Sequence, residues 1–342
     1  MSSLRVLVTG GAGFIGSNLA HKLVELGHRV AILDNFHPAY GGNDRNLFEI
    51  QNNIELIRGD ILDQNLMTKL VQDSDVVYHI AAQCSHVDSL TDPWFDLEVN
   101  CKGTLCVLEA ARQSPKKPVI IYAGTRATIG APLELPASET TLPNPTDIYG
   151  VNKLAAELYG SVYARVHRIP FVTLRLTNCY GPRHQMKSGK YGILNWFVSL
   201  ALQNKPIKIF GTGEQLRDYL YIDDAIEAFI KTTHFAFDLR EEKKSWPLVQ
   251  LSGSQVPFAV IHIGSGKGLR FVDCARKITE KTKSPLEFVS WPQDRKAIET
   301  GDYVSDGKAA EEVLNWVPQV TFDDGLEKTI QFYSKNLSYY KI

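Results

Sequence analysis

The sequence predicts an α/β protein: a Rossmann-like, doubly wound parallel sheet with a smaller, discontinuous mixed α/β substrate domain towards the C-terminus. Three observations support this fold class. Short apolar, β-branched segments alternate with helical segments through the first half of the chain, as in a parallel sheet covered on both faces. A glycine-rich turn follows the first of these segments, and the regular alternation is lost after Pro182.

The predicted strands of the main sheet begin close to the first residue. Each strand is a short run of apolar and β-branched residues, and a helical stretch separates one run from the next. These runs are 4–9, 29–34, 54–58, 76–80, 119–122 and 172–176, and residues 260–263 are expected to return to the same sheet. Right-handed crossovers between such strands give the doubly wound arrangement.

The loss of regular alternation predicts a second domain made from separate segments. We expect residues 1–179, together with about 223–264, to form the cofactor-binding domain. We expect about 180–222 and 265–342 to form the domain that binds the substrate. Residues 238–258 are first charged and then polar, with two prolines, and are predicted to be an exposed insertion.

Composition and charge argue against several classes of protein. The chain has 37 Lys and Arg against 38 Asp and Glu, a net charge of −1, which disfavours nucleic-acid binding. No apolar run approaches the roughly 20 residues that span a bilayer, and no signal peptide is evident. The five cysteines have neither metal-ligand nor disulfide spacing, so we expect no metal site and a reduced, cytoplasmic setting. Cys101 and Cys106 are expected to be small buried apolar residues.

A dinucleotide-binding motif spans Thr9 to Gly16, where the first strand turns into a helix. Its glycines at positions 10, 13 and 16 permit a tight turn, close approach to a pyrophosphate, and close packing of helix on strand. Asp34 ends the second strand, 18 residues after Gly16, and can accept hydrogen bonds from both ribose hydroxyls. That carboxylate would repel the extra phosphate of NADP, so the predicted cofactor is NAD. A turn or capping aspartate is the alternative role for Asp34.

Tyr149 and Lys153 form the candidate catalytic pair. They lie four residues apart at the start of a helix predicted over 149–165, so they share one helical face. A lysine ammonium and a positively charged nicotinamide ring both lower the pKa of a nearby phenol, and such a tyrosine can act as a general base. Thr125, just after a predicted strand, can hydrogen-bond a reacting oxygen. Without the dinucleotide-binding motif, the better interpretation would be that Tyr149 and Lys153 are simply an exposed pair on a helix.

In chain order, these motifs resemble those of the extended short-chain dehydrogenase/reductase family, specifically its nucleotide-sugar epimerases and dehydratases. The resemblance covers nearly the whole chain. It implies a NAD-dependent enzyme that acts on a nucleotide-diphosphate sugar. It also implies a homodimer formed through two helices per subunit, here about 100–113 and 149–165.

The resemblance also assigns roles to individual residues. The implied catalytic residues are Thr125, Tyr149 and Lys153. The residues implied to bind or line the cofactor are Gly10, Gly13, Phe14, Ile15, Gly16, Asp34, Asn35, Asp60, Ile61, Ala81, Ala82, Gln83, Asn100, Tyr149 and Lys153. The residues assigned to the substrate are His86, Thr125, Asn178, Arg183, Phe210, Arg217 and Arg295, and guanidinium groups suit phosphate oxygens. For His86, Arg183 and the neighbouring His184, a position outside the pocket is the alternative.

The residues after Thr125 favour an epimerase over a dehydratase. The family's 4,6-dehydratases carry an acidic pair directly after the catalytic threonine, and its sugar-acid decarboxylases keep a nearby glutamate. Here Arg126 and Ala127 follow instead, so the general acid for loss of water is missing. The resemblance therefore implies epimerisation, most simply at carbon 4. The sugar is transiently oxidised to a keto sugar, and hydride returns to the opposite face.

Several alternatives stay open from the sequence. A C2 epimerase of a CDP-sugar, or a nucleotide-sugar dehydratase or reductase of the same family, would share most of these motifs. A non-catalytic NAD-binding regulator would keep the glycine motif without needing Thr125, Tyr149 and Lys153 together. The sequence names neither the nucleotide base nor the sugar.

Overall fold

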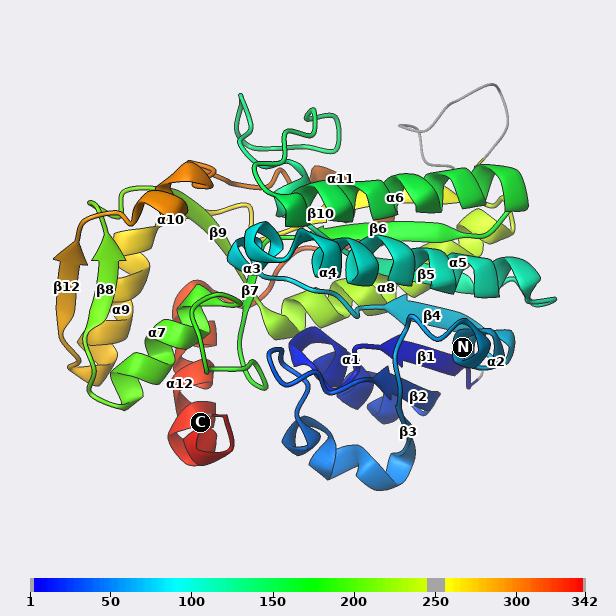
Figure 1. The fold of residues 1–342 in the computed structure, drawn as a ribbon, viewed down its shortest axis with the longest axis horizontal. Helices are drawn as coiled ribbons and strands as arrows, with labels where there is room; N and C mark the ends of the chain where they lie inside the picture. Colours follow the sequence, from blue (N-terminus) through cyan, green and yellow to red (C-terminus); the bar gives the residue numbers. More distant parts are fainter. Residues whose placement is uncertain (1–2, 245–255, 341–342) are drawn as a thin grey trace.

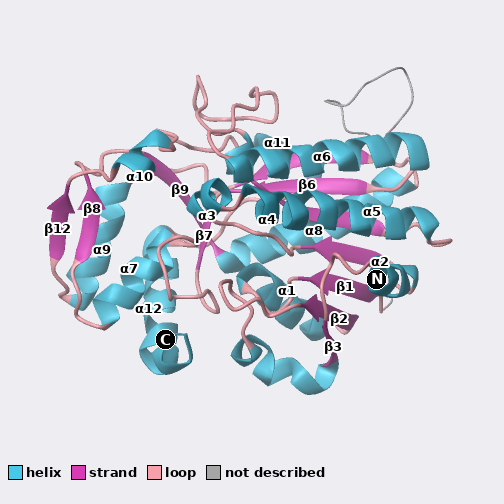
Figure 2. Ribbon diagram, in the orientation of Figure 1, coloured by secondary structure: helices cyan, strands magenta, loops and turns pink. Residues whose placement is uncertain are grey.

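A seven-stranded parallel sheet with helices on both faces forms the centre of the molecule (Figure 1, Figure 2). The computed structural model describes residues 3–244 and 256–340. The strand order is β10-β6-β5-β4-β1-β2-β3. The strands are β1 (Arg5–Thr9), β2 (Arg29–Asp34), β3 (Ile54–Arg58), β4 (Val76–His79), β5 (Val119–Thr125), β6 (Phe171–Leu176) and β10 (Phe258–Ile263). The predicted Rossmann-like fold class is therefore confirmed.

The central strands are continuous apolar runs because both faces of the sheet are covered. All six residues of β6 are buried, and neighbouring residues of β1, Val6 and Leu7, belong to different apolar clusters. Helices α1 (Phe14–Glu25) and α8 (Ile222–Arg240) contribute to one cluster. Helices α2 (Gln64–Gln72), α5 (Gly103–Gln113) and α6 (Ile148–His167) contribute to the other. The two apolar clusters, one on each face of the sheet, hold the ends of the central strands at fixed positions.

Strand β10 completes one edge of the sheet. It pairs in parallel with β6, with Ile261 opposite Leu174, so the prediction that residues 260–263 return to the sheet is confirmed. The predicted exposed insertion at 238–258 is wrong at its ends. Residues 238–240 belong to α8, whose apolar pattern runs on to the buried Leu239, and Phe258 is buried in β10. Residues 245–255 of that insertion lie outside the described residues.

Short helices lie between the strands of the main sheet and carry several site residues. They are η1 (Asp44–Asn53), α3 (His86–Thr91), α4 (Pro93–Leu97), a π-helical turn η2 (Glu98–Lys102) and η3 (Arg126–Thr128). Strand β5 runs on to Thr125, three residues beyond its predicted end at 122. Thr125 is therefore the last residue of a strand, and Arg126 begins the helical turn that follows.

Two smaller sheets lie where the chain leaves β6 (Figure 1), with strand orders β11-β9-β7 and β12-β8. Their strands are β7 (Asn178–Tyr180), β8 (Ile207–Phe210), β9 (Leu216–Tyr221), β11 (Gly268–Arg270) and β12 (Leu286–Val289). The accompanying helices are α7 (Ile193–Leu202), α9 (Phe271–Thr282), α10 (Gln293–Ala297), α11 (Lys308–Leu314) and α12 (Phe322–Tyr340). Helix α11 packs on α8 and β10, so part of the chain that follows β11 also contacts the main sheet. The domain limits given above remain a prediction.

Within the described part of the chain, none of the helices is long and apolar enough to cross a membrane. Cys101 and Cys106 are buried, as predicted, with exposed fractions of 6% and 8%. Both thiols are free, as are those of the other three cysteines.

Candidate functional site

A cavity at the carboxyl ends of the strands brings most of the predicted site residues together. It lies beside the boundary between β1 and β4, where the strand order reverses. Open α/β sheets bind their ligands at such a position. The predicted residues that line this cavity are Gly10, Gly13, Phe14, Ile15, Asp34, Asn35, Asp60, Ile61, Ala81, Ala82, Gln83, His86, Thr125, Tyr149, Lys153 and Asn178.

The glycine-rich turn leaves room for a dinucleotide to approach the backbone. Gly10 has a φ of +67°, and a Cβ atom there would lie 2.7 Å from the Cα atom of Ala81. A Cβ atom on Gly16 would lie 2.2 Å from the carbonyl oxygen of Gly10, so Gly16 serves close packing behind the cavity wall. The start of α1 has no side-chain cap. Its N–H groups are therefore suited to the pyrophosphate of NAD.

Asp34 is held at the wall of the cavity by backbone hydrogen bonds. Its Oδ2 accepts from the N–H of Ala12 at 3.0 Å, and its Oδ1 accepts from the N–H of Phe36 at 2.8 Å. Burial raises the pKa of Asp34, and these two hydrogen bonds oppose that rise. A carboxylate can accept about four hydrogen bonds. Asp34 therefore keeps acceptor capacity for the two ribose hydroxyls of NAD.

Tyr149 and Lys153 lie one turn apart on α6 and are almost completely buried, with exposed fractions of 7% and 2%. The Nζ atom of Lys153 lies 4.0 Å from the centre of the Tyr122 ring. Burial lowers the pKa of Lys153 to about 8, and the charge of Glu157 opposes that change. The pair therefore combines a phenol and an ammonium group on one wall of the cavity.

The pKa of Tyr149 differs from the expectation drawn from the sequence. Burial raises it above the ordinary value for tyrosine, and a hydrogen bond with Thr125 opposes the rise. The prediction that Lys153 lowers this pKa is wrong for the protein alone, because the cost of burying a phenolate is larger. A positively charged nicotinamide ring in the cavity would act in the opposite direction to burial.

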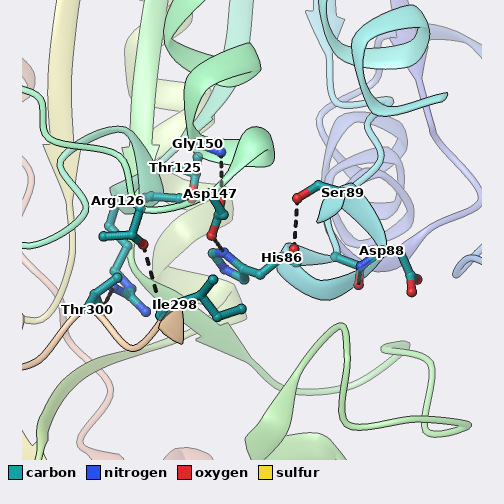
Figure 3. Close-up of polar contacts among 12 residues, drawn as sticks. His86, Asp88, Ser89, Thr125, Arg126, Asp147, Gly150, Ile298 and Thr300 are labelled. Carbon is teal, nitrogen blue, oxygen red and sulfur yellow. Dashed lines mark hydrogen bonds and ion pairs between the residues drawn. The ribbon is translucent and has the colours of Figure 1, made fainter. Parts of the chain in front are cut away.

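Asp147, which no motif in the sequence singled out, joins two walls of the cavity (Figure 3). Its Oδ1 accepts from the N–H of Gly150 at 2.8 Å and so caps α6. Its Oδ2 lies 2.5 Å from Nδ1 of His86. The His86 ring meets the Tyr149 ring edge-on, with 5.2 Å between the ring centres. Aspartate directly before a helix is a capping signal, but its second partner is distant in sequence.

A buried polar network fixes the helices behind the cavity. Asp96 Oδ1 accepts from Asn152 Nδ2 at 2.7 Å and from Asn100 Nδ2 at 3.1 Å. Asp96 Oδ2 accepts from Gln83 Nε2 at 2.7 Å. Among the described residues, Asn100 belongs to this network and does not line the cavity, although it was expected to bind the cofactor. Its effect on the cofactor is therefore indirect.

Three residues assigned to the substrate point elsewhere in the described structure. Arg183 donates from Nη1 to Asn18 at 2.9 Å, and Phe210 packs against Trp291. Arg217 forms an ion pair with Glu299. None of the three lines the cavity.

Arg295 and His184 are the last two residues that the sequence raised for the substrate pocket. Arg295 falls in α10, and its side chain lies outside the described residues. His184, whose place the sequence left open, does line the cavity, with its ring 4.4 Å from that of Phe14. Over residues 3–244 and 256–340, no group of three or more His, Cys, Asp or Glu could hold a metal ion.

Comparison with known proteins identifies the family. The model of the NAD-dependent epimerase/dehydratase family matches residues 6–238. The chain belongs to the NAD-dependent epimerase/dehydratase family. A UDP-glucose 4-epimerase of Mycolicibacterium smegmatis is 32% identical over 333 residues, covering 96% of this chain and 98% of that protein. A UDP-N-acetyl-alpha-D-glucosaminuronate decarboxylase of Bacillus cytotoxicus is 33% identical, covering 96% of this chain and 97% of that protein.

A solved structure shows the same fold. The UDP-glucose 4-epimerase of Thermotoga maritima, solved with UDP-glucose, has a TM-score of 0.82 and 29% identity, covering 98% of this chain and 100% of that chain. This NAD-dependent epimerase/dehydratase is therefore an enzyme of nucleotide-sugar metabolism. Its cofactor is NAD, as the sequence predicted.

Proposed function

We propose that this enzyme epimerises a nucleotide-diphosphate sugar at carbon 4. The reaction proceeds by transient oxidation to a keto sugar and return of hydride to the opposite face. The observation that carries the proposal is that Thr125, Tyr149 and Lys153 line one cavity with the glycine-rich turn. The UDP-glucose 4-epimerase among the relatives supports both carbon 4 and a UDP carrier.

Bound NAD supplies the hydride acceptor, which the amino-acid side chains lack. The Tyr149 hydroxyl, hydrogen-bonded to Thr125, is placed to accept the proton of the sugar hydroxyl. Lys153, with a pKa of about 8, is mostly protonated at neutral pH, and together with the positively charged nicotinamide ring it would oppose the effect of burial on the Tyr149 pKa. The same tyrosine returns the proton when the keto sugar is reduced, so the cycle requires no second general acid.

The lining of the cavity argues against loss of water. Asp34 ends β2 and Asp60 follows β3, both at the cofactor end, and they are the only carboxylates among the described lining residues. Among the described residues, the carboxylate nearest to this end of the cavity, Asp147, is held by His86 and by the N–H of Gly150 and does not line the cavity, so no free carboxylic acid is available to protonate a leaving hydroxyl group. Decarboxylation, the activity named for one relative, is disfavoured in the same way because Ala127 stands where the resemblance expects an acidic side chain.

A labelled substrate tests the reaction class. We expect UDP-glucose deuterated at carbon 4, in ordinary water, to give a product of unchanged mass that keeps the deuterium, with no net NADH. The hydrogen is removed and returned within one active site, so it does not exchange with solvent. Mass spectrometry and product separation make both measurements, with CDP-linked and dTDP-linked sugars run in parallel.

Two other results would each contradict the proposal. A product lighter by one water would establish a dehydratase. Deuterium lost from the inverted carbon would indicate that a proton is abstracted next to a keto group, which is a different epimerisation chemistry.

A further inference from the structure

Arg126 is a cationic side chain in the cavity wall that the proposed chemistry does not use. It directly follows Thr125 and lines the same cavity. Its Nε donates to Oδ1 of Asn178 at 3.1 Å, and its Nη1 donates to Oγ1 of Thr300 at 3.1 Å. Figure 3 shows the side chain beside Thr300. The Tyr303 ring packs against the guanidinium, 5.4 Å from its Cζ atom to the ring centre. These contacts hold the group in one orientation.

The carboxylates near Arg126 are already engaged by other residues. Asp147 is bonded to His86, and Glu299 forms an ion pair with Arg217. Among the described residues, no carboxylate lies within ion-pair distance of Arg126, and its Nη2 makes no hydrogen bond. The cavity wall therefore holds a fixed guanidinium that has unused donors and, in the part of the chain that the structure describes, no counter-ion.

The surroundings of Arg126 penalise its charge. Burial lowers the pKa of this guanidinium to about 10, and the nearby charge of Arg217 acts in the same direction. A charge in such a position is costly unless an anion pairs with it. A substrate group that carries a negative charge would supply the missing partner.

The position of Arg126 along the chain indicates which substrate group this is. In the proposed reaction Thr125 holds the oxygen on carbon 4, and Arg126 is the next residue. In a hexopyranose the diphosphate is attached to carbon 1, across the ring from carbon 4. Carbon 6 is attached to carbon 5, the direct neighbour of carbon 4, and in a uronic acid it is a carboxylate. A guanidinium fork matches the two oxygens of that carboxylate.

We propose that Arg126 binds a carboxylate at carbon 6, so that the enzyme prefers a nucleotide-linked uronic acid to the neutral hexose. The inference rests on the proposed function, since it takes Thr125 to hold the carbon-4 oxygen. Arg126 is then a residue that determines specificity, and Asn178 and Thr300 are residues that position it.

Substitution of Arg126 tests the proposal on two sugars that differ only at carbon 6. We expect the parent enzyme to favour UDP-glucuronate over UDP-glucose in kcat/KM. Arg126→Met should lower the value for UDP-glucuronate roughly ten- to a hundredfold, because it removes a charge-assisted hydrogen bond. The kcat/KM for UDP-glucose should change less than about threefold. For UDP-glucuronate, the kcat/KM of Arg126→Lys should lie between those of the parent enzyme and Arg126→Met. Arg276→Met, on the exposed face of α9, is the control for loss of an arginine.

Equal losses on both sugars in Arg126→Met would overturn the proposal, since Arg126 would then act on a group common to both, such as the diphosphate. A parent enzyme that prefers UDP-glucose would overturn it as well. Calorimetric titration of the NAD-loaded proteins with each sugar measures the same preference without turnover. If UDP-glucuronate binding depends on Arg126 but no epimerised product forms, the proposed reaction is wrong and the role of Arg126 still stands. If the enzyme forms an epimerised product but UDP-glucuronate binding does not depend on Arg126, the role of Arg126 is wrong and the proposed reaction still stands.

Discussion

Tyr149 is the side chain on which the proposed chemistry depends most directly. Tyr149→Phe removes one hydroxyl and keeps the ring that packs edge-on against His86. We expect turnover to fall by roughly two to four orders of magnitude, the scale for loss of a positioned general base, with NAD binding unchanged. A steady-state epimerase assay and quantification of bound NAD provide the measurements. Tyr159→Phe, farther along the same helix and outside the cavity lining, is the matched control. Activity within about tenfold of the parent would show that another group acts as the base.

Asp34 makes a separate prediction, which concerns the choice of cofactor. The Asp34 carboxylate accepts hydrogen bonds from the N–H groups of Ala12 and Phe36. Asp34→Asn removes the negative charge but keeps one oxygen, which can still accept one of these two bonds. We expect weaker binding of NAD and less discrimination against NADP, because the repulsion of the extra phosphate is lost. The dinucleotide released from each denatured protein is identified and quantified. Recovery of NADP as the main species from the parent protein would refute the role given to Asp34.

The sequence could predict those site residues whose signal is local. The glycine turn and the spacing of Tyr149 and Lys153 lie within one turn and one helix, so their proximity follows from backbone geometry. The contact between His86 and Asp147 joins residues 61 positions apart, and no local spacing encodes it. Arg217 pairs with Glu299, 82 positions later, and does not line the cavity. A motif can place an arginine in chain order without predicting which carboxylate it will pair with.

Helix α6 has two apolar faces, and only one of them is covered. Ala156, Gly160 and Ala164 are buried against the sheet, where small side chains allow close approach. The outer face and the neighbouring helices α3 and α4 expose large apolar side chains: Leu90, Trp94, Leu97, Val151, Leu158, Val162 and Val166, with Trp94 76% and Leu158 58% exposed. An exposed apolar surface of this kind is typical of a protein–protein interface.

The contribution expected from α5 to such an interface needs correction. Val107 and Leu108 are fully buried within the subunit, because α5 packs between α2 and α6. The apolar surface is therefore centred on α6 and on α3 and α4. The two short helices were not predicted, since each is only five or six residues long and too short to show a helical repeat of apolar residues.

The whole molecule is predicted to be a homodimer formed through this surface. Light scattering should give about twice the chain mass of 38.3 kDa. Leu158→Glu, which places a charge at the centre of the apolar surface, should reduce the measured mass to that of one chain, with an unchanged circular dichroism spectrum. Leu133→Glu, at a loop residue that is 97% exposed, is the control for an added charge. A parent protein that is monomeric at micromolar concentration would contradict the prediction.

The sequence predicted the main sheet more completely than the two smaller ones. Each main strand is a run of four to seven residues with a strong apolar pattern, and its neighbours follow from the crossover rules. Strand β11 has only three residues and pairs with β9, about fifty positions earlier. A strand of that length carries too few residues for its pattern to be recognised, so its partner emerges only from the packed structure.

The place of β10 at the edge of the sheet determines the order in which the protein can be completed during synthesis. Strand β6 ends at Leu176, but its outer neighbour begins only at Phe258. Until that segment leaves the ribosome, a strand that is wholly buried in the mature protein presents an unpaired apolar edge to solvent, and such edges recruit other chains. The segment made in the interval includes β7 and β9, which contribute Asn178 and Tyr219 to the lining of the cavity. We therefore expect the nascent chain to depend most on chaperones during that interval, and truncation before residue 258 to leave the outer edge of β6 unpaired.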